Sequence, residues 1–280
     1  MRVLIFHGYL LAGTGSNVYN ARLAAALVRL GHDVHLLCQE RHPERQPFVA
    51  RAGDWDEGAL RVRELDAGGE AALAPGGEGE PGGRAEAESE AAAGVRARDG
   101  GCEAGSCTVY RPDIGGLLPV YVADRYEGVR ACTFAQCSDD QLSRYVEANV
   151  AAVREVRELV RPHAALANHL VMGPAILARA LRGEVPYAVK VHGSALEYTV
   201  KPQPERFLPY AREGLRDARG VLVGSRHTAE SLWRALQAPP WLVARTRLGP
   251  PGVDVQRFAP REPHEAARAL RALPARVRAL

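Results

Sequence analysis

The first 38 residues contain the feature that most restricts the fold of this chain. A short apolar run, Arg2–His7, leads into a turn with glycines, Gly8–Gly15, and then into a helical pattern from about Ser16 to Leu30. After Gly31 comes a second apolar run, Asp33–Cys38. Continuous apolar runs are typical of parallel strands buried on both faces, and strand, glycine turn, helix and strand form the repeating unit of a doubly wound sheet. The sequence therefore predicts an α/β fold with a doubly wound parallel sheet.

The first helix also has recognisable ends. Val18, Leu23 and Leu27 recur at near-helical spacing. Ser16 or Asn17 is expected to cap the amino end, because short polar side chains accept hydrogen bonds from the first free N–H groups. Gly31 stands where a C-terminal glycine is expected.

Residues Gly68–Gly101 interrupt this alternation. They hold ten of the 28 glycines, six glutamates and almost no large apolar residue. Such a composition offers little apolar surface to offset the entropy of ordering, so we expect a disordered insertion in a surface loop.

The strand and helix patterns resume after the insertion. Strands are expected at Thr108–Tyr110, Leu117–Val122, Ala164–Ala167, Tyr187–Val191 and Val221–Val223, and helices at Asp139–Val160, Gly173–Leu181, Glu205–Ala218 and His227–Leu236. The apolar run Leu242–Leu248 leads through Pro250–Gly252 to a last helical pattern, Pro263–Leu280, which Pro274 is expected to interrupt. We therefore expect one large domain over residues 1–248, followed by a linker and the start of a further domain over 249–280.

Composition narrows the possible function classes. The longest apolar runs fall far short of the ~18 residues of a membrane span, and no secretory signal opens the chain, so we expect a cytoplasmic protein without a transmembrane segment. A net charge of +3 is too small to indicate nucleic-acid binding. Of the 36 basic residues only Lys190 and Lys201 are lysines.

The five cysteines leave two interpretations. Cys102 and Cys107 have the same spacing as Cys132 and Cys137, which would suit a four-cysteine zinc site or a redox pair. Four intervening residues is the upper limit for paired zinc ligands, so buried or incidental thiols are favoured.

The segment Gly13-Thr14-Gly15-Ser16-Asn17 is a candidate phosphate-binding loop. It lies between the first strand and the first helix, where backbone N–H groups and the helix dipole attract anions. It matches neither Gly-x-Gly-x-x-Gly nor a P-loop, which disfavours nicotinamide and NTPase functions. An ordinary glycine-rich turn explains the same residues and stays an alternative.

A second group of polar residues follows the strand at Tyr187–Val191. His192 comes directly after this strand, at the sheet edge where doubly wound proteins bind ligands. Lys190 precedes it by two residues and shares its face, and Glu197, Tyr198 and Lys201 follow. This grouping favours a functional over a structural role for His192.

Four stretches in order resemble the N-terminal domain of family 4 glycosyltransferases of the GT-B fold. They are HGYLLAGTGSNVYNARLAAAL (7–27), VKVHGSALEY (189–198), VGSRHTAESL (223–232) and PPGVDVQRF (250–258), the last of which is similar to the interdomain linker of the family. The resemblance implies a Rossmann-like domain. It covers nearly all of the chain except the insertion.

The resemblance also implies roles for particular residues. Gly13, Thr14, Gly15 and Ser16 stand where the family's loop closes over the donor diphosphate and the acceptor, and His192 matches the histidine beside the donor sugar. Ser225 matches the serine before the next helix. With these we group Asn17, Lys190, Gly193, Ser194, Glu197 and Lys201 as candidate donor-phosphate or acceptor contacts. No catalytic metal or other cofactor is expected.

The implied activity is a hexosyltransferase-like reaction of carbohydrate biosynthesis. A nucleotide sugar would be the co-substrate and its sugar would be transferred with retention, without a metal. The acceptor would be a sugar, a lipid or a small molecule, which leaves peripheral membrane contact open.

One departure from the family pattern leaves two further functions open. In the family a second, donor-binding domain follows the linker, whereas only about twenty residues follow Phe258 here. A non-catalytic truncated binding module, or a subunit of a split transferase, is therefore the alternative function. A nucleotide-sugar epimerase of the same fold is a third, less favoured because the His-Gly-Ser and linker motifs fit transferases better.

Overall fold

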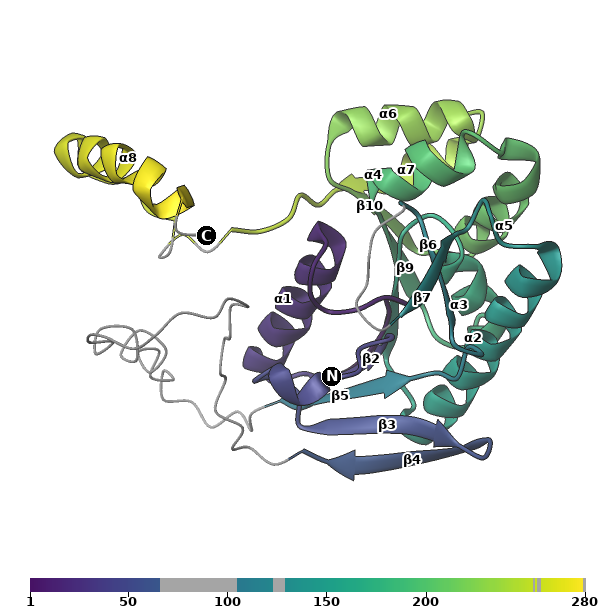
Figure 1. The fold of residues 1–280 in the computed structure, drawn as a ribbon. Helices are drawn as coiled ribbons and strands as arrows, with labels where there is room; N and C mark the ends of the chain where they lie inside the picture. Colours follow the sequence, from purple (N-terminus) through teal and green to yellow (C-terminus); the bar gives the residue numbers. More distant parts are fainter. Residues whose placement is uncertain (66–104, 123–128, 254, 256–257, 279–280) are drawn as a thin grey trace. The chain divides into compact units, whose positions relative to one another are not determined.

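The apolar runs of the sequence form the central strands of one sheet. The computed structural model describes residues 1–65, 105–122, 129–253, 255 and 258–278 (Figure 1). Strand β1 (Arg2–Phe6) pairs in parallel with β2 (Asp33–Leu37) on one side and with β8 (Ala164–Asn168) on the other. Leu4, Ile5 and Phe6 are all buried, as expected of a parallel strand covered on both faces.

The sheet has nine strands in the described part of the chain. Their order is β11 (Thr246–Leu248), β10 (Gly220–Val223), β9 (Tyr187–Val191), β8, β1, β2, β5 (Cys107–Arg111), β3 (Arg51–Asp56) and β4 (Ala59–Glu64). All neighbouring strands are parallel except β3 and β4, which form an antiparallel hairpin at one edge. Strands β6 (Leu117–Val120) and β7 (Arg130–Thr133) make a separate parallel pair. The predicted α/β class with a doubly wound parallel sheet is confirmed.

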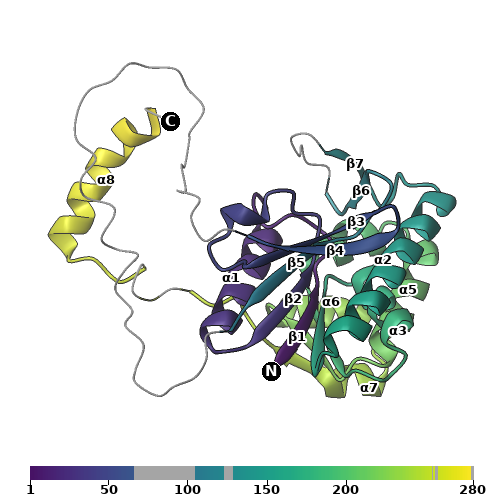
Figure 2. The same ribbon diagram turned by 90° about the horizontal axis from the view of Figure 1, so that it is seen from below.

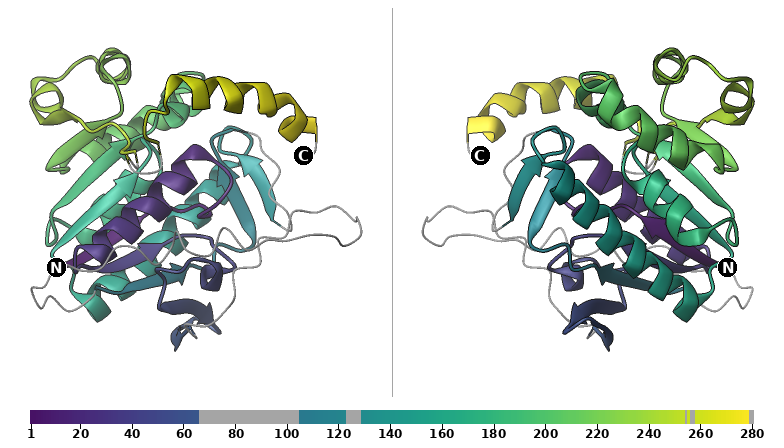
Figure 3. Two further views of the ribbon diagram at one scale, coloured as in Figure 1. Left: turned by 90° about the vertical axis from the view of Figure 1, so that its left-hand side faces the viewer. Right: turned by 90° about the vertical axis from the view of Figure 1, so that its right-hand side faces the viewer.

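Helices cover both faces of this sheet. Helix α1 (Gly15–Arg29) lies on one face, and α2 (Asp139–Val160), α3 (Gly173–Leu181) and α5 (Pro204–Arg216) lie on the other (Figures 2 and 3). Successive residues of β1 follow this division: Ile5 packs in the core cluster that contains Ala24 of α1, whereas Leu4 and Phe6 belong to the cluster under α2, α3 and α5. Helix α6 (Arg226–Ala235) and α7 (Pro240–Arg245) pack beside β10.

The ends of several helices and strands agree with the sequence prediction, whereas the start of α1 does not. Helices α2 and α3 and strand β9 have the predicted bounds, and Gly31 adopts a φ of 79°, the left-handed conformation that glycine tolerates after a helix. The expected cap at Ser16 or Asn17 is wrong. Helix α1 begins one residue earlier, at Gly15, and its N-cap is Thr14, whose side chain makes no capping hydrogen bond.

Other differences arise where local pattern and tertiary context conflict. The hairpin of β3 and β4 was not predicted, because β4 is an exposed edge strand without an apolar run. The run Leu242–Leu248 divides into α7 and β11. Helix α8 (Pro263–Arg278) continues through position 274, where an interruption was expected.

The described residues form two compact units, Met1–Gly249 and Pro250–Leu280. The second contains α8. The predicted disordered insertion, Gly68–Gly101, lies outside the described residues, as does Cys102. Among the helices described, none combines the length and the apolar composition of a membrane-spanning segment.

Candidate functional site

Three histidines gather where neighbouring parallel strands end. His7 follows β1, His169 follows β8 and His192 follows β9, and these strands are adjacent in the order β9, β8, β1. The rings of His7 and His169 are stacked with centroids 5.9 Å apart, and those of His169 and His192 are 4.8 Å apart. The carboxyl edge of the sheet thus forms a site lined with imidazoles, at the position where open α/β sheets bind ligands.

The His7 side chain is fixed by the first turns of α1 and the loop before it. Its Nε2 donates to Oδ1 of Asn17 (3.0 Å) and to the carbonyl of Leu10 (3.1 Å), and the amide of Asn20 donates to its Nδ1 (3.0 Å). Full burial lowers the pKa of His7 to about 4, although the bonds to Asn17 and Leu10 partly oppose this shift. His7 is therefore neutral at pH 7, with its proton on Nε2.

His192 is fixed from the neighbouring strand. The amide nitrogen of Asn168 donates to the carbonyl of Phe6 (3.4 Å), so its oxygen is the acceptor for Nε2–H of His192 (3.2 Å). Burial, helped by the nearby His7 and the Lys190 charge, lowers the pKa of His192 to about 3. The second ring nitrogen, Nδ1, therefore carries a lone pair at neutral pH and can accept a hydrogen bond from a ligand.

His169 lies between the other two histidines and is 1% exposed. Neither of its ring nitrogens has a hydrogen-bond partner among the described residues. Its ring packs against those of Tyr121 (4.3 Å between centroids) and Tyr9 (5.3 Å), and its φ of 67° is unusual for a residue other than glycine. Burial, followed by the neighbouring His192 and His7, holds the pKa of His169 well below its usual value.

The glycine loop lies above this edge, at the amino end of α1. Gly13 has a φ of 92°, a conformation that favours glycine, whereas Gly15 is the first residue of the helix and has no such requirement. A Cβ at either position would meet no atom within 4 Å. Thr14 and Ser16 are half-exposed, with their hydroxyls 3.3 Å apart. The loop thus presents backbone at an open helix N-terminus, as an anion site requires.

Asn17 and Tyr19 connect this loop to the histidines. Asn17 is fully buried, and its amide donates to the carbonyl of Ala12 while its oxygen accepts from His7. Tyr19 meets the ring of His192 edge-on, with centroids 5.4 Å apart. The structure therefore brings the predicted loop and His192 together, and it gives Asn17 a role in shaping the loop.

The two lysines differ in their surroundings. The ammonium of Lys190 is buried, donates to the carbonyl of Gly249 and lies 5.3 Å from the ring centroid of Tyr19. Burial lowers the pKa of Lys190. Lys201 is partly exposed and forms an ion pair with Glu197 (2.7 Å), whose carboxylate also accepts from Ser231 of α6 (2.6 Å).

The remaining predicted residues lie at the starts of helices. Gly193 and Ser194 form a short helical turn, α4 (Gly193–Ala195), directly after His192, and the bulged helix η2 (Leu196–Val200) follows. Ser225 is the N-cap of α6, and its hydroxyl accepts from the backbone N–H of Thr228 (3.1 Å).

Sequence reasoning missed His7, Tyr19, Asn20, Asn168 and His169. A signal existed for two of them, because His7 and His169 directly follow apolar strands as His192 does. Asn168 ends β8 itself, and its contact with His192 depends on the pairing of β8 with β9.

The thiols form no metal centre in the described part of the chain. No group of three or more His, Cys, Asp or Glu side chains there is arranged to hold a metal ion. Cys38 and Cys107 are buried in the core, and burial raises the pKa of Cys107 to about 12. Cys132 and Cys137 are neighbours, with sulfur atoms 2.7 Å apart.

Comparisons with known proteins find one family model and several similar solved structures. The model of the "Glycosyl transferase 4-like domain" family matches residues 14–249. Sucrose-phosphate synthase from Thermosynechococcus elongatus superposes with a TM-score of 0.51 at 16% identity, over 98% of this chain and 53% of that enzyme. A putative UDP-N-acetylglucosamine 2-epimerase from Listeria monocytogenes matches 88% of this chain and 44% of its own at 11% identity, with a TM-score of 0.44. No curated protein sequence matches significantly.

These comparisons show a fold and a family together. The chain spans about half the length of the GT-B enzyme sucrose-phosphate synthase, and its nine-stranded, mostly parallel sheet corresponds to that half. The family model covers every described strand of the sheet except β1, and it includes His169 and His192 but not His7. The chain therefore belongs to the glycosyl transferase 4-like family.

Proposed function

We propose that this chain is the acceptor-side, N-terminal half of a retaining, metal-independent glycosyltransferase that takes its sugar from a nucleotide-sugar donor. The observation that carries the proposal is the neutral His192, held by Asn168 at the carboxyl edge of the sheet and in ring contact with Tyr19 of the helix that follows the glycine loop. The proposed acceptor is a sugar, a lipid or a small molecule, and the proposed compartment is the cytoplasm.

The geometry supports separate roles for the glycine loop and His192. Exposed N–H groups at Gly13–Ser16 and the amino end of α1 would stabilise negative charge on a leaving diphosphate, the electrostatic contribution that usually dominates catalysis. His192, with a free Nδ1, would accept a hydrogen bond from a sugar hydroxyl. The acceptor hydroxyl would be aligned between them, a proximity effect.

A second candidate function follows from the family match, which shows a family and a fold but no reaction. The chain would then be a non-catalytic binding module, or one subunit of a split transferase, that binds an acceptor or a donor-binding partner. Adding a donor-binding half would produce turnover with a transferase half or with a subunit of a split transferase, and none with a non-catalytic module.

The test combines the purified chain with a candidate donor-binding half, a panel of nucleotide sugars and a panel of acceptors. We expect a glycosylated product whose anomeric configuration, read by NMR, is that of the donor. A metal chelator should leave the rate unchanged. Inversion, chelator sensitivity, or the absence of product with every donor would each contradict the proposal.

A further inference from the structure

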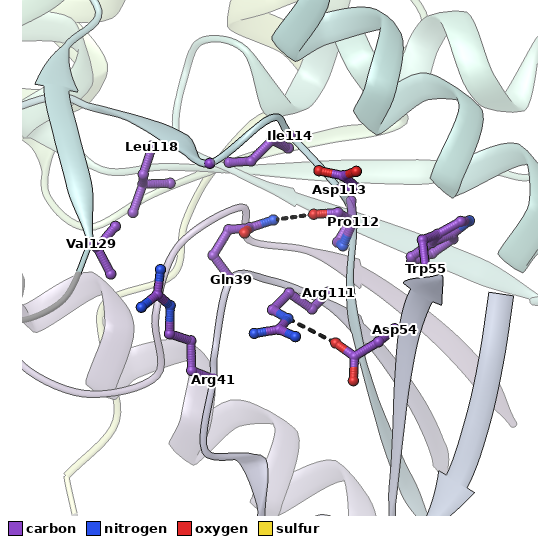
Figure 4. Close-up of a pocket in the computed structure, with 11 residues that line it drawn as sticks. Gln39, Arg41, Asp54, Trp55, Arg111, Pro112, Asp113, Ile114, Leu118 and Val129 are labelled. Atoms are coloured by element: carbon purple, nitrogen blue, oxygen red, sulfur yellow. Dashed lines mark hydrogen bonds and ion pairs between the residues drawn. The ribbon is translucent and has the colours of Figure 1, made fainter. Parts of the chain in front are cut away.

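A pocket that the proposed chemistry does not use opens where β2, β3 and β5 end. It encloses about 210 Å³ and is lined mainly by Gln39, Arg41, Asp54, Trp55, Arg111 and Asp113 (Figure 4). This volume is below the about 300–1,000 Å³ of pockets that enclose drug-sized ligands, so it suits one small group.

The pocket lies beside the histidine-lined edge. Strand β2 pairs with β1 in parallel, so the residues that follow β2 lie beside those that follow β1. The backbone N–H of Gln39 donates to the carbonyl of Tyr9 (2.7 Å), two residues after His7. A ligand that extends along this edge would therefore reach both places.

The charged groups of the pocket balance one another. Arg111 donates through Nε to Oδ1 of Asp54 (2.7 Å), and Oδ1 of Asp113 accepts from the N–H of Gly115 (2.9 Å). Among the described lining residues, Arg41 and Arg111 supply two guanidinium groups and Asp54 and Asp113 supply two carboxylates, so these residues together carry no net charge. Such a lining gives no net attraction to a phosphate, but it offers donors and acceptors together. Hydroxyl groups, which both donate and accept, match it.

One end of the pocket is aromatic and the other aliphatic. Figure 4 shows Trp55 at one end and Leu118 and Val129 at the other. The indole N–H of Trp55 donates to Glu155 of α2 (2.7 Å), which fixes the ring. An aromatic face carries partial negative charge and attracts the C–H groups that a sugar ring presents on its faces.

We propose that this pocket binds one uncharged, hydroxyl-rich sugar ring of the acceptor. This inference rests on the proposed function, and it commits the acceptor to a neutral carbohydrate rather than to a phosphorylated or acidic one. The ring would lie with one face toward Trp55 and its hydroxyls toward Asp54, Arg111 and Asp113.

The tryptophans provide a direct test. The chain has three, Trp55, Trp233 and Trp241, and each carries one indole N–H group that ¹⁵N NMR detects. Titration of the full chain with neutral methyl glycosides of hexoses and N-acetylhexosamines should shift the Trp55 signal and leave those of Trp233 and Trp241 in place. Sugar phosphates and uronates should shift it at least tenfold more weakly. The Trp55→Phe variant identifies the signal.

Asp54→Asn and Asp56→Asn are matched variants on one strand. Asp54 lines the pocket, whereas Asp56 pairs with Arg61 outside it. We expect Asp54→Asn to weaken glycoside binding at least tenfold and Asp56→Asn to leave it unchanged. The proposal is overturned if no neutral glycoside moves the Trp55 signal, if only acidic sugars do, or if the two variants bind alike. Because binding needs no donor half, this result is separate from that of the transfer assay.

Discussion

At the scale of single residues, the candidate site depends on three adjacent histidines that stay uncharged. Burial lowers the pKa of each, and neighbouring imidazoles lower the pKa values of His169 and His192 further. A neutral cluster can share hydrogen bonds with sugar hydroxyls without attracting counterions. The cluster lowers the stability of the folded protein at acidic pH, because these rings are protonated far more readily in the unfolded chain.

For His7, the direction of this pH effect on the free energy of unfolding can be measured. Its pKa is about 4 in the folded protein and 6.5 without burial, so between these values the unfolded state binds more protons. His7 therefore contributes stability that is complete above pH 6.5 and is lost, by up to about 3 kcal/mol, as the pH falls toward 4. Urea unfolding at pH 7.5 and 5.0 should show a smaller loss for His7→Gln than for the wild type. The exposed His42→Gln variant is the control. Equal losses in all three proteins would contradict the assignment.

The two lysines differ in what their removal should do. Lys190→Met deletes a buried donor to the Gly249 carbonyl, which should lower the free energy of unfolding by about 1–3 kcal/mol. Lys201→Met removes a partly exposed ion pair with Glu197 and should cost less than about 1 kcal/mol. Denaturant unfolding measures both. If Lys190→Met is as stable as the wild type, the bond to Gly249 contributes little to stability, and the ammonium of the wild-type protein is available to a ligand.

Gly15 and His192 should give different kinetic signatures in the reconstituted transferase. Gly15 lies in open space with no positive φ, so Gly15→Val should fold normally but obstruct the approach of a phosphate, raising KM and lowering kcat. Of the two loop glycines, only Gly13 has a positive φ. His192→Ala should act mainly on kcat. Full activity of Gly15→Val would reduce the loop to an ordinary turn.

At the scale of elements, the sequence predicted a helix or a strand correctly where the segment's own apolar residues recur at the spacing of that element. The apolar runs at Arg2–His7 and Tyr187–Val191 predicted strands β1 and β9. The spacing of apolar residues predicted the whole length of α2. Strand β4 has no such run, and only its pairing with β3 makes it a strand. The site follows the same rule. His192 could be predicted from its place after one strand, whereas its grouping with His7 and His169 requires the order β9, β8, β1, which no local pattern contains.

Helix α2 allows a test of local signals at the scale of one element. Ser138 and Gln141 form a capping box, in which each side chain accepts from the backbone N–H of the other. Ser138→Ala should therefore lower the free energy of unfolding by about 1 kcal/mol. Ser143→Ala, an exposed site in the same helix, should change it by less than about 0.5 kcal/mol. If both variants have the stability of the wild type, packing alone defines where α2 begins.

At the scale of the whole molecule, two groups of polar side chains lie at the same carboxyl edge of the sheet. The ends of β1, β8 and β9 carry the imidazoles, and the ends of β2, β3 and β5 carry the polar pocket, whose described charges balance. A donor at the first place and an acceptor at the second would meet at the glycine loop, which lies between β1 and α1. On the proposed mechanism this edge is a surface for substrates, and a second surface must face it before transfer.

A reaction centre between two surfaces predicts that one surface alone is inactive. The 280-residue chain corresponds to 53% of the length of sucrose-phosphate synthase, and the proposed reaction centre lies between the two halves of a GT-B enzyme. By itself the chain should therefore show negligible transfer from any nucleotide sugar, because few groups would orient the donor against the loop and the proximity effect would be lost. A sensitive radiolabelled-donor assay of the chain alone, with the reconstituted pair as positive control, measures this. Robust turnover by the chain alone would mean that its own residues complete the site, and the two-surface mechanism would be wrong.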